Sequence, residues 1–348
     1  MIRPADNGID KKTEMKTGNM RVLAFREKNG SRTLIFVLDK GKITNLYCED
    51  TRGAAVGDIY LARVLNTLPD IQAAFLDAGL DDSVFINTDR KDFPLADRVY
   101  DGRLRPGDIF PVKIRQLPKG SKKAKVIAAD IPAEEYEHKT APCLLHRAAG
   151  IFEQCLKRVI ATEGACFYTD DKGLYEDAIE VMKRAEAGKG QIREKIRLYE
   201  DEDISLVTLF DLRKKTGNLL SRRVKLKCGG ELVFDETEAL NVIDVNSASF
   251  EKGGRDTILK LNTEAVWEAA YHISARSLSG MIIIDLVNMD DSESEKILLE
   301  ELKTALSLNC PGAEALDITK MGLAEIRVPG GKQKISSFRV VIDNTILM

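Results

Sequence analysis

The sequence is poor in the residues that most often build metal and acid–base sites. Its 348 residues include only three histidines, which are far apart, and six cysteines with no CxxC pair among them. This spacing fits neither a zinc site nor a disulfide framework and indicates reduced thiols in a cytoplasmic protein. Any metal or acid–base chemistry in this chain therefore has to use carboxylates.

Long apolar runs and a net positive charge are also missing. No run approaches the ~20 apolar residues of a membrane span, so we expect none. The first 19 residues lack the apolar core of a signal peptide and are predicted to be a disordered lead-in. The net charge of −3 excludes an overall basic field for nucleic acid. Lys and Arg do cluster locally, as in VKIRQLPKGSKKAKV at 112–126, and such a patch can bind phosphate.

The order of patterns along the chain indicates an α/β protein with more than one domain. Short strands with turn signals run from residue 21 to about 130 and predict a small barrel or sandwich. Helical periodicity begins near Cys143. After a hairpin signal at Gly229-Gly230, an apolar strand, an amphipathic helix with Asn262 or Thr263 as its expected cap, and a second apolar strand follow. A strand–helix–strand unit of this kind places its two strands parallel in one sheet.

Each of these two strands carries one aspartate in an apolar run. Asp285 lies within GMIIIDLVNM, which reads as a fully buried strand, and Asp244 lies within NVIDVN. Asn246, two residues after Asp244, points to the same side of its strand. Two neighbouring carboxylates repel each other, and a hard divalent cation such as Mg²⁺ relieves that repulsion. The alternative is that each aspartate lies exposed at a strand end or binds backbone amides in a loop.

This part of the chain resembles the ribonuclease E / ribonuclease G family. The segment from GGELVFDETEALNVIDVNSA to GMIIIDLVNM is similar to its catalytic block, and GDIYLARVLNTLPDIQAAFLDAGLDDSVFI is similar to its OB-fold. The resemblance implies a ribonuclease-H-like catalytic domain with an OB-fold barrel, inserted or N-terminal, that binds RNA. It implies that Asp244 and Asp285 bind Mg²⁺, with Mn²⁺ as a substitute, and that Asn246 positions one of them. The implied reaction is hydrolysis of single-stranded RNA to 5′-phosphate and 3′-hydroxyl ends, in RNA processing or decay.

The resemblance also assigns an RNA-binding surface. Phe75 and Phe85 match the aromatic residues of the family's barrel, which stack on unpaired bases. Without the resemblance, both would be read as core residues. The basic loop after the barrel supplies four candidate contacts to RNA: Lys119, Lys122, Lys123 and Lys125.

Several residues depart from the family pattern. Arg147 remains as a candidate contact to an RNA 5′-phosphate, but Ala148 stands where the family has threonine. Asn288 stands where a second aspartate is common. The zinc-binding CPxC motif is absent, so we expect neither zinc nor a zinc-linked oligomer. These departures describe a divergent, shortened member of the family.

The patterns and the resemblance together predict a division of the chain into six segments. They are a lead-in (1–19), N-terminal strands of the ribonuclease-H-like domain (20–55), the OB-fold barrel (56–131), a helical region similar to a shortened 5′-end sensor (132–218), the ribonuclease-H-like catalytic core (219–331) and a tail (332–348).

Three functions remain open at this point. The first is a Mg²⁺-dependent endoribonuclease. The second is an RNA-binding protein of the same fold that cuts weakly or not at all, such as a ribosome or RNA assembly factor, and the departures favour it. The third, a metal-dependent enzyme acting on a small phosphorylated substrate, leaves the barrel and the lysines unexplained.

Overall fold

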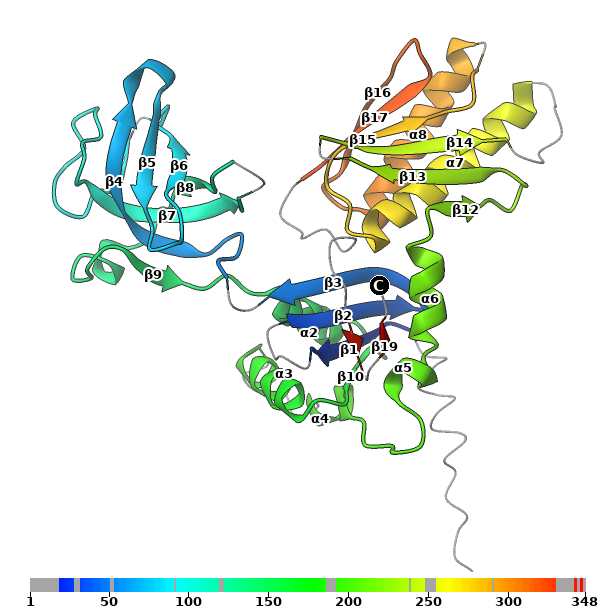
Figure 1. Ribbon diagram of the computed structural model, residues 1–348, viewed down its shortest axis with the longest axis horizontal. Helices are drawn as coiled ribbons and strands as arrows, with labels where there is room; N and C mark the ends of the chain where they lie inside the picture. Colours follow the sequence, from blue (N-terminus) through cyan, green and yellow to red (C-terminus); the bar gives the residue numbers. More distant parts are fainter. Residues whose placement is uncertain are drawn as a thin grey trace, which may run out of the picture. The chain divides into compact units, whose positions relative to one another are not determined.

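The chain forms two compact units, here called the core unit (residues 1–51 and 151–348) and the barrel unit (residues 52–150) (Figure 1). The structure is a computed structural model. It describes residues 19–27, 32–50, 53–90, 92–118, 122–185, 192–237, 239–247, 255–289, 291–329, 341–342 and 345–346. The predicted lead-in and tail lie almost wholly outside these residues.

The barrel unit is a closed barrel of five strands with a sixth strand added. Strand β4 pairs with both β5 and β7, which closes the ring β4-β5-β6-β8-β7 of an OB-type barrel. Its elements are β4 (Ile59–Leu68), η1 (Pro69–Ile71), β5 (Ala73–Asp77), β6 (Val84–Asn87), β7 (Ile109–Gln116), β8 (Lys125–Ala128), η2 (Ala133–Glu135) and β9 (Cys143–His146). The predicted α/β class with an OB-fold barrel is confirmed.

Strand β9 corrects the prediction that helical structure begins near Cys143. Residues 143–146 pair with β4 of the barrel, and the helix begins only at Ile151. Cys143 and Leu145 are half-buried against the barrel, whereas Leu144 and His146 are exposed. Burial in this segment therefore alternates with the period of a strand. The segment was predicted as helical because its apolar residues were read together with those of the helix that follows.

The first sheet of the core unit is covered by helices on both faces. Its order is β11-β10-β1-β2-β3, a three-stranded antiparallel meander extended by two parallel strands, which is a ribonuclease-H-like arrangement. Val22 packs toward α2 and α3, while Leu23 packs toward α5 and α6. The run VLAF (22–25) is apolar throughout because both faces of the sheet are buried there. The elements are β1 (Arg21–Arg26), β2 (Arg32–Asp39), β3 (Lys42–Asp50), α2 (Ile151–Ala161), β10 (Cys166–Thr169), α3 (Lys172–Ala185), α4 (Ile192–Lys195), β11 (Ile196–Leu198), α5 (Leu206–Leu209) and α6 (Leu212–Leu219).

The second sheet of the core unit has the order β12-β13-β14-β15-β17-β16 and packs against α7 and α8. The predicted parallel pairing of the two aspartate-bearing strands, β14 and β15, is confirmed, as is the hairpin at Gly229-Gly230. The elements are β12 (Arg223–Lys225), β13 (Glu231–Glu236), β14 (Asn241–Asn246), α7 (Arg255–Ala275), β15 (Gly280–Asp285), α8 (Ser292–Asn309), β16 (Glu314–Ile318) and β17 (Leu323–Val328). Two short strands, β18 (Val341–Ile342) and β19 (Thr345–Ile346), pair with each other.

The two sheets of the core unit are separate, which differs from the predicted division of the chain. The strands of residues 20–55 were assigned to one domain with residues 219–331, but they pair with β10 instead of the aspartate-bearing strands. Helix α7 packs on the second sheet, and this helix and the turn after it contact β3 of the first sheet. The Tyr271 hydroxyl donates to the Ile43 carbonyl at 2.7 Å, and the Ser277 hydroxyl donates to the Leu46 carbonyl at 2.9 Å.

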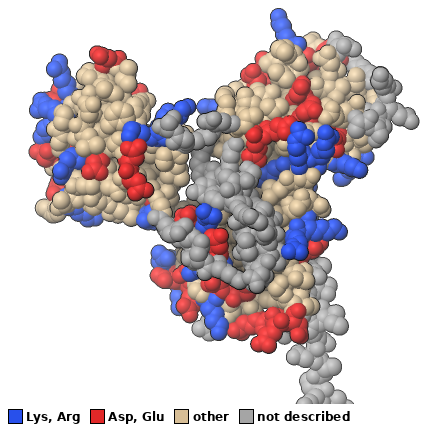
Figure 2. Space-filling model, viewed as in Figure 1, with Lys and Arg blue, Asp and Glu red and all other residues tan. Residues whose placement is uncertain are grey.

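The face of the protein drawn in Figure 2 shows no single dominant charge, and the described residues include no membrane-spanning helix. Lys and Arg side chains are interspersed with Asp and Glu on the face drawn in Figure 2, as the small net charge leads one to expect. Within the described residues, every helix is too short or too polar to cross a lipid bilayer.

Candidate active site and RNA-binding surface

Asp244 and Asp285 stand opposite each other on neighbouring parallel strands. The register of β14 and β15 pairs the two residues directly, so both side chains leave the same face of the sheet. Asp244 is half-buried and accepts a hydrogen bond from Nδ2 of Asn246 at 2.7 Å. The fold thus brings together the three residues that the sequence picked out as a candidate site.

Strand β15 is not buried on both faces, which corrects the prediction made from its apolar run. Ile282 and Ile284 are fully buried against α7 and α8, whereas Met281 is 58% exposed. Asp285 is the last residue of the strand and is also exposed. Its carboxylate therefore remains in water, and no interior partner is needed to balance a buried charge.

Asn262 holds the chain just after Asp285 and was not recognised as a site residue from the sequence. Its fully buried side-chain amide donates to the Val287 carbonyl at 2.8 Å and accepts from the Val287 amide at 3.1 Å. We predicted Asn262 or Thr263 as the helix cap, but α7 begins at Arg255 and both residues lie in its interior. The sequence did contain a signal for this role: a polar amide side chain lies on the apolar face of the helix, one turn before Val266.

The donor set at this site is suited to a hard cation. Two carboxylates and one amide present only oxygen ligands, which Mg²⁺ prefers, and waters complete its shell. Among the described residues, no cluster of three or more His, Cys, Asp or Glu side chains has the geometry of a metal site, so a cation here would rely on the two carboxylates and the amide of Asn246. The pair Asp244–Asp285 is thus the best candidate for a metal site in the described part of the chain.

In the barrel unit, Phe75 and Phe85 point outward instead of into the core. They are paired residues on β5 and β6, and their ring centroids lie 5.8 Å apart in an edge-to-face arrangement. Both rings are partly exposed, whereas the residues flanking them on each strand are buried: Ala74, Leu76, Val84 and Ile86. An exposed pair of aromatic rings on an OB-type barrel can stack on unpaired bases.

The four candidate lysines differ in their surroundings. Lys119 lies outside the described residues, and Lys122 is exposed. Lys123 places Nζ 2.5 Å from an Asp82 carboxylate oxygen and 5.8 Å from the centre of the Phe75 ring. Lys125 is exposed on β8 directly opposite Phe85. Lys123 and Lys125 thus place positive charge beside the two aromatic rings.

Arg147 pairs with a carboxylate inside the barrel unit. Its Nη1 donates to Asp58 at 2.8 Å and to the Gly53 carbonyl at 3.0 Å, and the Ala148 amide donates to the other oxygen of Asp58 at 2.7 Å. Asp58 is fully buried, whereas the Arg147 side chain is 52% exposed. The pair fixes the chain after β9 to the start of β4. The predicted 5′-phosphate contact of Arg147 stays a prediction.

Comparison with known proteins covers most of the chain. Residues 115–327 match the Ribonuclease E/G family. The chain is 26% identical to Ribonuclease G of Escherichia coli (strain K12) over 387 residues, covering 85% of this chain and 77% of that protein. It is 31% identical over 192 residues to a protein named Putative ribonuclease E from Buchnera aphidicola, covering 55% of this chain and 46% of the other.

A plant protein shows a similar likeness. The chain is 28% identical over 211 residues to the Ribonuclease E/G-like protein, chloroplastic, of Arabidopsis thaliana, covering 57% of this chain and 20% of that protein. The alignment with Ribonuclease G is longer than this chain of 348 residues, so that relative contains segments that this chain lacks. The family match spans more than half of the chain and includes both aspartates of the candidate site. The protein belongs to the ribonuclease E/G family.

Proposed function

We propose that this protein is a Mg²⁺-dependent endoribonuclease that hydrolyses single-stranded RNA to 5′-phosphate and 3′-hydroxyl ends, in RNA processing or decay in the cytoplasm. The observation that carries the proposal is the direct pairing of Asp244 with Asp285 on neighbouring strands, with Asn246 bonded to the first. Membership of a family of ribonucleases supports the reaction class.

The proposed site residues have separate roles. Asp244 and Asp285 hold the metal ion, and Asn246 orients the Asp244 carboxylate through its 2.7 Å hydrogen bond. When bound, Mg²⁺ supplies charge neutralisation at the scissile phosphate and activation of water, and Mn²⁺ can substitute. Asn262 keeps the Val287 backbone in place and thereby limits the movement of the strand end that bears Asp285.

The barrel supplies the proposed preference for single strands. Stacking on Phe75 and Phe85 requires unstacked bases, which a duplex does not offer. Lys122, Lys123 and Lys125 add phosphate contacts, so binding weakens as salt rises because counterions are released when RNA binds.

A second function, RNA binding with weak or no cleavage, is favoured by one observation. Arg147 is bonded to Asp58, and the Ala148 amide is bonded to the same carboxylate. Nη1 of Arg147 and the Ala148 amide, two groups that could meet an RNA 5′-end, are therefore already bonded within the protein. This observation concerns how substrate is selected, and the carboxylate pair is unaffected by it. We therefore place the nuclease first.

A cleavage assay separates the two functions. Purified protein is mixed with a labelled, unstructured 5′-monophosphorylated RNA, with and without Mg²⁺, beside the variant Asp285→Asn. Cleavage that requires both Mg²⁺ and Asp285 is expected. Binding without Mg²⁺-dependent products contradicts the nuclease and supports the RNA-binding protein. Repeating the assay with a 5′-hydroxyl RNA tests Arg147, because a preserved 5′-phosphate contact predicts slower cleavage of that RNA.

A further inference from the structure

We propose that a groove on the outer face of the barrel, next to Phe85, binds an additional nucleotide of single-stranded RNA. This inference rests on the proposed RNA-binding function and extends it to a defined second subsite. The groove has a volume of about 450 Å³ and crosses strands β6, β8 and β7. Its lining includes Phe85, Arg90, Phe93, Arg115, Lys125 and Ile127. That volume falls within the roughly 300–1,000 Å³ of small-molecule sites.

The groove continues the surface on which the two aromatic rings lie. Phe85 is opposite Lys125 in the strand pairing, and Ile127, two residues further along β8, projects from the same face. Ile127 is 46% exposed although it lies within a strand of the barrel. Apolar surface therefore extends from the exposed Phe85 ring into the groove. A strand of RNA with one base on the aromatic pair can place its neighbouring base there.

The charge around the groove favours a phosphate-bearing ligand. Arg115 and Lys125 are exposed, and neither forms an ion pair with any residue that the structure describes. By contrast, Arg90 at the groove edge is paired with Asp130 at 2.5 Å. The groove thus combines an apolar floor with two cations open to a ligand and one further lining carboxylate, Asp89, and the excess of positive charge and the apolar floor match a nucleotide phosphate and its base.

One wall of the groove is held in place before any ligand arrives. Asp89, Arg90 and Phe93 belong to the connection between β6 and β7, and Arg90 also donates to the Ala128 carbonyl of β8 at 3.3 Å. Phe93 packs edge-to-face on Phe110 of the barrel interior, with ring centroids 5.2 Å apart. A groove with a fixed wall loses little conformational entropy when RNA binds.

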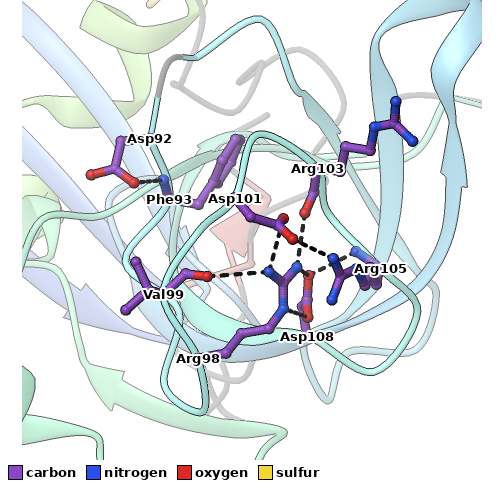
Figure 3. Close-up of polar contacts among 8 residues, drawn as sticks. All are labelled: Asp92, Phe93, Arg98, Val99, Asp101, Arg103, Arg105 and Asp108. Carbon is purple, nitrogen blue, oxygen red and sulfur yellow. Dashed lines mark hydrogen bonds and ion pairs between the residues drawn. The ribbon is translucent and has the colours of Figure 1, made fainter.

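Ion pairs fix the remainder of the same connection (Figure 3). The Arg98 guanidinium donates to the nearly buried Asp108 carboxylate at 2.9 and 2.7 Å and to Asp101 at 3.1 Å. Arg98 also donates to the Arg103 carbonyl at 2.8 Å, and Arg105 pairs with Asp101. The connection that carries the groove wall is therefore cross-linked at both ends.

The test measures affinity against RNA length. Fluorescence anisotropy with labelled oligouridines of three to ten nucleotides is recorded with chelator present, so that no cleavage occurs. The full-length protein is compared with Arg115→Ala and Ile127→Ala. The matched controls are Arg103→Ala and Val99→Ala, an exposed arginine and an exposed apolar residue of the same unit outside the groove. Phe75→Ala, at a ring outside the groove lining, reports on the aromatic pair.

The expected result depends on oligonucleotide length. Each groove variant weakens binding of the longer oligomers about tenfold, the effect of losing one base or phosphate contact, and leaves the shortest oligomer unchanged. The Arg115 variant also lowers the salt dependence of binding. If groove and control variants have equal effects while Phe75→Ala still weakens binding, the groove proposal is wrong and the RNA-binding surface stands. Failure of the unaltered protein to bind any oligomer overturns the proposed RNA-binding function as well.

Discussion

Asp58 in the barrel unit and Asp285 in the core unit both lie at the end of an apolar strand segment, yet their carboxylates have opposite surroundings. Asp58 is fully buried and accepts hydrogen bonds from Arg147 and from the backbone amides of Ala55 and Ala148. Asp285 is exposed and faces a second carboxylate, Asp244. A carboxylate surrounded by donors is part of the structure, whereas two adjacent carboxylates open to solvent are suited to binding a cation.

The largest expected effect is the loss of stability when the buried carboxylate is removed. Asp58→Ala leaves two backbone amides and one guanidinium group without their acceptor, and we expect it to lower the free energy of unfolding by about 3 kcal/mol. Hydrogen exchange of the barrel amides is the measurement. Asp58→Asn should cost less because its oxygen can still accept, and Asp81→Ala, at an exposed aspartate, serves as control. Equal protection in all variants would contradict a structural role.

Changing the two aspartates of the candidate site should have the reverse pattern, a loss of activity without a loss of stability. Asp285→Asn and Asp244→Asn each remove one negative charge from the proposed metal site, and we expect cleavage to fall by about 10²–10³-fold. Thermal stability should stay the same or rise, because a repulsion between like charges is relieved. Asp317→Asn, at an exposed aspartate two strands away on the same sheet, is the control and should cut normally. A matching loss in that control would refute a specific role for the pair.

The aromatic pair gives the next largest effect. We expect Phe75→Ala or Phe85→Ala to weaken single-stranded RNA binding by about 1–3 kcal/mol, the usual contribution of one stacked base. Because both rings are partly exposed, the stability of the barrel should change little. Phe110→Ala, which empties a fully buried position, is the contrasting variant and should destabilise the barrel. The measurements are anisotropy titration and thermal melting, and a large loss of stability in Phe85→Ala would assign that ring to the core.

How far the sequence predicted these features depended on the kind of signal each residue gave. An aspartate in an apolar strand is unusual, so Asp244 and Asp285 could be found from their pattern, and the strand–helix–strand spacing correctly made their strands parallel. Exposure could not be read in the same way. The run of isoleucines in β15 suggested burial on both faces, yet helices pack against one face only and leave Met281 largely exposed.

Other features needed three-dimensional information of a different sort. A phenylalanine in a strand has the same pattern whether it faces the core or the solvent, so Phe75 and Phe85 depended on the family resemblance. Asn262 bonds the backbone of Val287, 25 residues further along the chain, and no local sequence pattern predicts a contact over that separation. The start of α7 was misplaced because Asn262 is a favourable cap by residue type. Its side chain instead satisfies the backbone beside the site.

Asn262 allows a finer test of the difference between structural and site residues, because it is buried in the core and also bonds the backbone next to the candidate site. Asn262→Leu removes both hydrogen bonds to Val287, and we expect a loss of about 1–2 kcal/mol in stability. We also expect a higher Mg²⁺ concentration for half-maximal cleavage, because the strand end that bears Asp285 is less restrained. Thr263→Val, one residue further along α7, is the control. A change in stability with no change in Mg²⁺ dependence would confine Asn262 to a structural role.

The smallest effect concerns pH and helix α7, which contacts both sheets of the core unit. His272 is buried on α7, where its Nδ1 accepts from Arg276 at 3.0 Å and its Nε2 lies 3.3 Å from Glu268. Burial lowers the pKa of His272, and the charge of Arg276 adds to this, against the opposing effect of Glu268. The folded protein therefore takes up a proton on this histidine less readily than the unfolded chain does.

The sign of the pH effect follows from that difference. Below the unfolded histidine pKa of about 6.5, the unfolded chain binds a proton more readily than the folded chain does. The free energy of unfolding therefore decreases as the pH is lowered, by at most about 1.4 kcal/mol per pH unit. The single tryptophan, Trp267, lies on the same helix and reports unfolding by fluorescence. The pKa of Glu268 is lowered mainly by its hydrogen bond with His272. Protonation of Glu268 therefore also destabilises the folded protein, but at a more acidic pH than the effect of His272. We expect His272→Gln to flatten the slope between about pH 5 and 6.5, and an unchanged slope would show that the histidine is not its source.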